Sequence, residues 1–255
     1  MRVGRCASRE DTNARAWQSP HAGSDNGQMK TQVDHLVVLA ASLDDGERWC
    51  ERVLGLRPDA GGRHTLMGTH NRLLKIASAA YPNAYLEIIA IEPGAVPTRY
   101  TGTRRWFDMD DPLLAQSVAR DGPRLIHWVA RTQDIARTCA GWLALGLDRG
   151  PALAAERMSP QGLLSWRITV RDDGARLLEG CLPTLIEWGS RHPCDAMPEQ
   201  HLRLTRLRIH HPESALLEAA WQAAALSGVA IESGPAAIEA TIQTPRGEVV
   251  LSSRR

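Results

Sequence analysis

Two short stretches of the chain each place a single histidine inside a run of apolar residues. Residues 33–39 read VDHLVVL around His35, and residues 125–129 read LIHWV around His127. Short runs rich in β-branched and other apolar residues favour buried strands. A lone histidine in such a strand is commonly a hydrogen-bonded core residue, so it is the recurrence of the pattern that suggests a functional role.

The first stretch begins a unit that spans residues 31–95. Ser42 and Asp44 can cap a helix, apolar positions up to residue 54 have a helical spacing, and Gly55 suits its end. Strand-like segments follow at 65–68, 71–76 and 85–91. The pattern predicts the order strand, helix, strand, strand, strand, or βαβββ.

The same order returns after a connector rich in proline and glycine, residues 92–123. In the second unit, residues 123–190, a helix is predicted at 134–145, with strands at 152–157, 164–170 and 185–188. A third, partial βαβββ unit is predicted at 200–255, with Arg206 where the other units have histidine. His35 precedes Gly55 by about 20 residues, a spacing that the later units roughly repeat. Coincidence between common strand–helix units would give a similar spacing.

Composition narrows the class of protein. The formal charge is +1 with both signs interspersed, so no nucleic-acid footprint is expected. The five cysteines include no C-x-x-C pair, which indicates a reducing compartment, and we expect a cytoplasmic protein. No apolar run reaches the length of a membrane span. Residues 1–30 lack a hydrophobic period and are predicted to be a disordered tail. Met29 directly precedes the first predicted strand and is a possible true start.

Carboxylates also recur inside apolar strands. Glu87 lies in the last predicted strand of the first unit, and Glu187 lies in the last strand of the second. Burying an unpaired carboxylate is costly, so each needs a partner. With His35 and His127 they would form a four-ligand site for a divalent metal such as Ni, Co, Mn, Zn or Fe. The alternative is that both glutamates lie at a rim or pair with arginine.

These residues and two further segments carry a family resemblance. Residues 62–74 (GRHTLMGTHNRLL) and 42–50 (SLDDGERWC) resemble stretches of the bacterial glyoxalase-like domain family, within the vicinal-oxygen-chelate superfamily. The resemblance covers roughly residues 31–190. It implies an α+β fold in which paired βαβββ modules form a cup-shaped mixed sheet around a metal. These modules would form one domain, residues 31–195. The resemblance also implies His35, His127, Glu87 and Glu187 as metal ligands, with the two glutamates as candidate catalytic residues.

Three functions remain open. The first is a metal-dependent lyase or isomerase acting on a small carbonyl or hydroxy-carbonyl substrate. The second is an Fe(II) extradiol-type dioxygenase with His35, His127 and Glu187 as its triad. Glu87 is evidence against this function, because a fourth protein ligand would fill a metal position that dioxygen needs. The third is a non-catalytic protein that sequesters a small molecule. A homodimer is possible for each.

Candidate substrate contacts lie outside the ligand positions. His70 and Asn71 stand in a predicted turn, and Trp106 and Trp166 are free to form a pocket wall. Trp128 and Trp188 directly follow ligand positions and are expected to pack in the core on the opposite sheet face. The alternative for His64 and His70 is that both are surface histidines. His192 has no matching carboxylate pattern and is expected to be structural or solvated.

Overall fold

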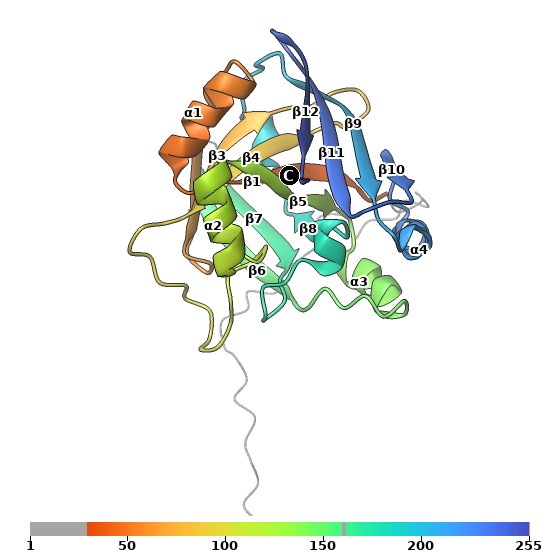
Figure 1. Ribbon diagram of the computed structural model, residues 1–255. Helices are drawn as coiled ribbons and strands as arrows, with labels where there is room; N and C mark the ends of the chain where they lie inside the picture. The colour runs from red at the N-terminus through yellow and green to blue at the C-terminus, as the bar shows by residue number, and fades with distance from the viewer. Residues whose placement is uncertain (1–29, 160–161, 255) are drawn as a thin grey trace, which may run out of the picture.

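The fold is α+β and is built around one curled sheet. The computed structural model describes residues 30–159 and 162–254, so all of the predicted tail except Lys30 lies outside the described residues. Eight strands form a half-barrel in the order β2-β3-β4-β1-β5-β8-β7-β6, and four more form a second sheet in the order β10-β9-β11-β12. The paired βαβββ units and the cup-shaped sheet are as predicted (Figure 1).

The first unit has the predicted order of elements. They are β1 (Gln32–Leu39), α1 (Leu43–Val53), β2 (Asp59–His64), β3 (Thr69–Lys75) and β4 (Tyr85–Ile91). Ser42 caps α1, because its hydroxyl accepts a hydrogen bond from the Asp45 N–H. Gly46 lets the helix lie close to the sheet, since a Cβ there would lie 2.3 Å from Ile88 Cγ2.

The second unit repeats this order after a connecting helix. Its elements are α2 (Pro112–Asp121), β5 (Arg124–Arg131), α3 (Ile135–Leu143), β6 (Ala152–Ser159), β7 (Gly162–Thr169) and β8 (Thr184–Trp188). Two short 3-10 helices follow β7 and β8, at Leu177–Gly180 and Pro193–Asp195. The two units join where β1 pairs antiparallel with β5, at the centre of the sheet.

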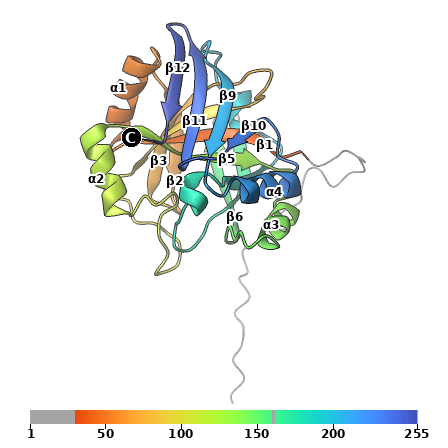
Figure 2. The same ribbon diagram turned by 45° about the vertical axis from the view of Figure 1, so that its right-hand side comes forward.

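The third unit supplies the second sheet and packs on the outside of the cup. It contains β9 (Arg203–His210), α4 (Ser214–Ala224), β10 (Val229–Glu232), β11 (Ala237–Thr244) and β12 (Gly247–Ser252). Its apolar residues share one core cluster with Leu36, Leu86 and Trp128 from the outer face of the first sheet. Trp142 of α3 donates its indole N–H to the Ala220 carbonyl, which ties α3 to α4 (Figure 2).

A second apolar cluster fills the inside of the cup. Val37, Ile89 and Val129 come from the central strands, and the connector adds Trp106 and Phe107. The two faces of the central strands are therefore both buried, as expected for a sheet that is covered on both sides. No helix in the described ranges is long and apolar enough to cross a membrane.

One local expectation was wrong, and one helix was not predicted. The strand expected at 65–68 is a turn, and the strand β2 lies before it, where the sequence DAGGRH carries no apolar signal. The connector at 92–123 contains the helix α2, which begins at Pro112 after an Asp111 cap. Proline at the first helical position and aspartate before it favour a helix start, so this signal was present in the sequence.

Candidate active site

An irregular pairing in β1 brings two polar side chains to the same place. Val33 pairs with Ala130 and His35 pairs with the next residue, Val129, so Asp34 has no partner of its own. Such a β-bulge redirects side chains locally. As a result, Asp34 and His35 contact each other: His35 Nδ1 donates to Asp34 Oδ1 at 2.7 Å, and neither side chain is more than 5% exposed.

Asp34 is the centre of a buried hydrogen-bond network. Its Oδ2 accepts from Trp188 Nε1 at 2.9 Å and from His192 Nε2 at 3.0 Å. His192 accepts from the Cys194 N–H through Nδ1, so its Nε2 carries the donated hydrogen. Burial works to raise the pKa of Asp34, but His192 and His35 outweigh it and hold the pKa well below its usual value. Asp34 is therefore ionised, and it fixes the hydrogen of His35 on Nδ1.

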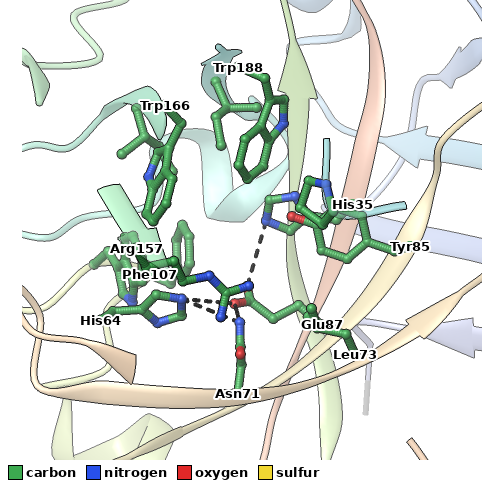
Figure 3. A pocket seen from close by; sticks show the side chains of 14 residues that line it. His35, His64, Asn71, Leu73, Tyr85, Glu87, Phe107, Arg157, Trp166 and Trp188 are labelled. Carbon is green, nitrogen blue, oxygen red and sulfur yellow. Dashed lines mark hydrogen bonds and ion pairs between the residues drawn. The ribbon is translucent and has the colours of Figure 1, made fainter. Parts of the chain in front are cut away.

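The free nitrogen of His35 faces a buried carboxylate. His35 Nε2 lies 3.6 Å from Glu87 Oε2, and Glu87 is 4% exposed. The other oxygen of Glu87 accepts from Asn71 Nδ2 at 2.6 Å. Asn71 is itself oriented, because its Oδ1 accepts from the Gly62 N–H at 2.7 Å. Glu87 thus has one oxygen that accepts from Asn71 and one that lies 3.6 Å from His35 Nε2, and both residues line the cavity (Figure 3).

A glycine pair in β2 makes room for this arrangement. The pairing of β2 with β3 is irregular between Ala60 and Arg63, where Gly61 and Gly62 lie. A Cβ on Gly61 would lie 2.0 Å from Asn71 Oδ1, and one on Gly62 would lie 1.6 Å from an Arg157 guanidinium nitrogen. Any larger residue at either position would displace a side chain of the site.

His64 completes the floor of the site in its neutral form. Its Nε2 lies 3.8 Å from Glu87 Oε1 and 3.3 Å from Asn71 Nδ2, and its Nδ1 lies 3.0 Å from Thr69 Oγ1. Burial lowers the pKa of His64 to about 4, with nearby Glu87 opposing that shift. His64 is therefore a neutral hydrogen-bonding group near pH 7.

These groups line one narrow cavity, and the empty space of about 430 Å³ around it includes open solvent. Its walls are mainly aromatic, with His35 stacked on Tyr85 at a ring distance of 4.6 Å and Trp166 tilted against Trp188 at 5.5 Å (Figure 3). The lining residues are His35, His64, Asn71, Leu73, Tyr85, Glu87, Trp106, Phe107, Arg157, Trp166, Ile168, Ile186, Trp188 and Pro193.

His127 lies elsewhere in the cup and is hydrogen-bonded on both nitrogens. Nδ1 lies 3.1 Å from the Gly180 carbonyl, and Nε2 accepts from the Thr184 N–H at 3.2 Å. The side chain is fully buried, and burial, with Arg149 adding to it, holds the pKa of His127 well below its usual value. Phe107 from the cavity wall packs against the His127 ring at 5.0 Å.

Glu187 points to the outer face of the sheet. Its Oε2 accepts from the Ile135 N–H at 3.1 Å, at the first turn of α3, and lies 3.6 Å from Arg167. A carboxylate at a helix N-terminus is favoured by the helix dipole. The alternation along β8 explains this placement, because Ile186 and Trp188 face the cavity and the residue between them faces away.

The predicted four-ligand metal set does not fit this arrangement. Of its four members, the structure brings together His35 and Glu87, while His127 and Glu187 are bonded elsewhere. In residues 30–159 and 162–254, no group of three or more His, Cys, Asp or Glu side chains is arranged to hold a metal ion. We therefore derive no chemical step through a metal.

The candidate substrate contacts divide in the same way. Asn71, Trp106 and Trp166 line the cavity. His70 pairs with Ala90 on the other face of β3 and is absent from the lining.

Sequence reasoning missed several residues of the site. The expectation that Trp188 packs in the core was wrong, whereas Trp128 does so and donates to the Cys181 carbonyl. Asp34 and Arg157 were not singled out, and His192 was expected to be structural or solvated. The adjacent pair Asp34-His35 was the one signal that could have revealed part of this network, since a buried carboxylate beside a histidine orients its ring.

Comparison with known proteins gives a family and a fold. Residues 33–225 match a family described as "Glyoxalase-like domain". A crystal structure of a hypothetical protein from Staphylococcus aureus has 14% identity and a TM-score of 0.53, and covers 81% of this chain and 87% of its own. We found no match among curated proteins.

Two enzymes align at lower scores. A Streptomyces coelicolor methylmalonyl-CoA epimerase in complex with 2-nitronate-propionyl-CoA has 15% identity and a TM-score of 0.36, and covers 63% of this chain and 96% of its own. A mutant of 4-hydroxymandelate synthase from Streptomyces coelicolor has 13% identity and a TM-score of 0.42, and covers 88% of this chain and 63% of its own.

Proposed function

The chain belongs to the glyoxalase-like domain family, and from that premise we propose that it is a lyase or isomerase that moves a proton on a small carbonyl or hydroxy-carbonyl compound. One observation carries the proposal. His35 Nε2 and Glu87 Oε2 face each other at 3.6 Å inside a cavity, and each is held by a buried partner of its own. Two such groups can remove a proton and return it.

The roles follow from the hydrogen bonds. Asp34 holds the His35 hydrogen on Nδ1, which leaves the Nε2 lone pair directed to the cavity. Asn71 donates to one oxygen of Glu87 and leaves the other able to accept a proton from carbon. A carbon acid next to a carbonyl, placed against Glu87 Oε2, would lose its proton to that carboxylate. The carboxylic acid formed in this way would return the same proton to the neighbouring carbon or to the carbonyl oxygen, and His35 Nε2, 3.6 Å away, can accept it in between.

The alternatives have less support from the geometry. An Fe(II) triad of His35, His127 and Glu187 would need side chains that lie on different faces of the sheet. A sequestering protein is compatible with the aromatic walls, but it does not explain why Glu87 and His35 are each oriented by a separate buried residue.

Deuterium exchange at carbon tests the proposal directly. Small hydroxy-carbonyl compounds such as hydroxyacetone and dihydroxyacetone would be incubated with the protein in D₂O, and loss of the C–H signal next to the carbonyl followed by NMR. We expect Glu87→Gln to slow exchange by about 100-fold or more, the usual scale of general base catalysis. Glu92→Gln, which changes a carboxylate paired with Arg63 just beyond β4, is the matched control. Exchange by Glu87→Gln at the wild-type rate would refute the role of Glu87.

A further inference from the structure

One arginine in the cavity has no protein partner. Arg157 lies on β6 and lines the cavity together with Glu87. Within the described residues it makes no hydrogen bond or ion pair, whereas Arg63, Arg72 and Arg99 each contact a carboxylate. A guanidinium presents five N–H donors in a fixed plane that suits carboxylate and phosphate groups.

The backbone opposite Arg157 is shaped around its guanidinium. Gly62 on β2 leaves the space that Arg157 occupies, since a Cβ there would lie 1.6 Å from the Arg157 Nη1 atom. Arg157 therefore extends from one edge strand of the half-barrel to the other, over the opening of the cup. Figure 3 shows its side chain extending into the cavity.

The groove that continues outward from the cavity is also lined by Arg157. It has a volume of about 1040 Å³, including open solvent, and shares Leu73, Arg157 and Pro193 with the inner cavity. Its two acidic residues are already engaged: Asp59 accepts from Gln200 Nε2, and Asp195 accepts from the His192 N–H. Arg191 adds a second guanidinium to the groove.

A further donor in the cavity wall lacks an acceptor. Trp106 is 8% exposed, and its buried indole N–H has no hydrogen-bond partner among the described residues. A buried donor without an acceptor carries a desolvation cost that a bound oxygen would relieve. The inner cavity thus offers its occupant the guanidinium of Arg157 and the proton acceptors His35 and Glu87, and Trp106, with its unpaired N–H, forms part of the wall.

We propose that Arg157 binds an anionic oxygen group of the substrate, so that the substrate class is a carbonyl compound carrying a carboxylate or a phosphate. The inference rests on the proposed function for the reacting end of the molecule, and it adds the second end. With the anionic group on Arg157, the carbon next to the carbonyl lies between the two edge strands, toward Glu87 and His35. Binding energy at Arg157 would then orient the reacting carbon.

Binding of simple anions tests the proposal without any turnover. Tryptophan fluorescence would be titrated with malonate and, separately, with inorganic phosphate, in buffer containing EDTA so that no metal bridges the anion. Malonamide, which has the shape of malonate without its charge, is the neutral comparison. We expect saturation by at least one of the two anions and no response to malonamide. Saturation by malonate alone indicates a carboxylate-bearing substrate, and saturation by phosphate alone indicates a phosphate-bearing one.

Variants assign the binding to Arg157. We expect Arg157→Gln to weaken anion binding at least 10-fold and Arg157→Lys to weaken it less. Gly62→Ala should also weaken it, because the added methyl group displaces the guanidinium. Arg137→Gln, which removes an exposed guanidinium on α3, should leave the dissociation constant within twofold. Lack of saturation by either anion, or equal binding by wild type, Arg157→Gln and Arg157→Lys, would overturn the proposal.

The two proposals fail separately. Glu87→Gln should retain anion binding while it loses exchange at carbon. Anion binding that depends on Arg157 in a protein without any carbon exchange would leave the binding site standing and remove the reaction. Exchange that depends on Glu87, together with anion binding unchanged in Arg157→Gln, would leave the reaction standing and remove Arg157 from substrate binding.

Discussion

Replacing Asp34 with asparagine tests whether a buried charge organises the site. Asp34 is fully buried and accepts hydrogen bonds from His35, Trp188 and His192. Asparagine has nearly the same shape, but it has one acceptor oxygen and an amide group that can only donate. The amide N–H would then face His35 if it takes the place of Oδ1, or both Trp188 and His192 if it takes the place of Oδ2. If it faces His35, the His35 hydrogen should move to Nε2, and the lone pair that faces Glu87 would be lost.

The size of the effect follows from the three hydrogen bonds. Bonds to a charged group contribute about 1.5–3 kcal/mol each, against about 0.5–1.5 kcal/mol for neutral ones. Loss of the charge therefore costs about 1 kcal/mol per donor, or about 3 kcal/mol in total. Removing a buried charge offsets part of that loss. We expect Asp34→Asn to lower the free energy of unfolding by about 2 kcal/mol at pH 7.

The effect should depend on pH in one direction. The pKa of Asp34 in the folded protein lies below its value in the unfolded chain. Its ionised form therefore contributes its full stability above about pH 4 and loses it as the pH falls through the lower, folded-state pKa. The difference in stability between wild type and Asp34→Asn should be constant from pH 7 to 5 and should shrink below about pH 4.

Urea unfolding followed by tryptophan fluorescence measures these differences. Asp111→Asn is the control, because it changes the aspartate that caps α2 to an equally good capping residue, with an expected change below about 0.5 kcal/mol. The ¹⁵N chemical shifts of His35 would report its tautomer in each protein. Equal stability of wild type and Asp34→Asn at pH 7, or a difference that persists unchanged below pH 4, would refute the buried charge.

Three further predictions separate local roles. Glu187→Gln should lower the free energy of unfolding by about 1 kcal/mol, because it weakens the start of α3. It should leave the carbon-exchange rate within about twofold of wild type. A rate loss like that of Glu87→Gln would contradict this prediction. Gly46→Ala should destabilise the protein by about 1–3 kcal/mol in urea unfolding, because the added methyl group would overlap Ile88. This overlap should outweigh the higher helix propensity of alanine. A more stable variant would show that α1 can shift away from the sheet. The pKa of His64 is about 4 in the folded protein, below its value in the unfolded chain. The free energy of unfolding therefore decreases as the pH falls from about 6.5, because the unfolded chain takes up a proton at His64 first. His64→Gln should reduce the pH dependence of unfolding between pH 6.5 and 4 by up to about 1.4 kcal/mol per pH unit, and an unchanged slope would show that His64 takes up a proton in the folded state.

The repeat of elements could be predicted from the sequence because apolar runs and helix caps carry it. His35 and Glu87 could also be identified, since each is a polar residue within an apolar strand and each faces the cavity. The same signal misplaced Glu187. Both faces of β8 are buried, so the sequence Leu185-Ile186-Glu187-Trp188 does not show which residues face inward.

The rest of the site depends on contacts between distant segments. His127 has the same sequence setting as His35, yet Gly180 and Thr184 occupy its nitrogens, and no local pattern could reveal those partners. His192 reaches Asp34 from a 3-10 helix that is 158 residues further along the chain. Arg157 was part of a predicted strand, but only the approach of Gly62 on the opposite edge shows its position over the opening.

The bulge in β1 makes the site sensitive to chain length more than to residue type. Val33 and His35 pair with two consecutive residues of β5, so Asp34 is one extra residue in β1. This extra residue allows Asp34 and His35 to contact each other. Deleting a single residue there would restore regular pairing, and successive side chains would then point to opposite faces. The carboxylate and the imidazole could then no longer lie on the same face of the sheet, while the apolar core would stay largely intact. Relatives of this chain that lack one residue at this point should therefore keep the fold and lose the oriented histidine.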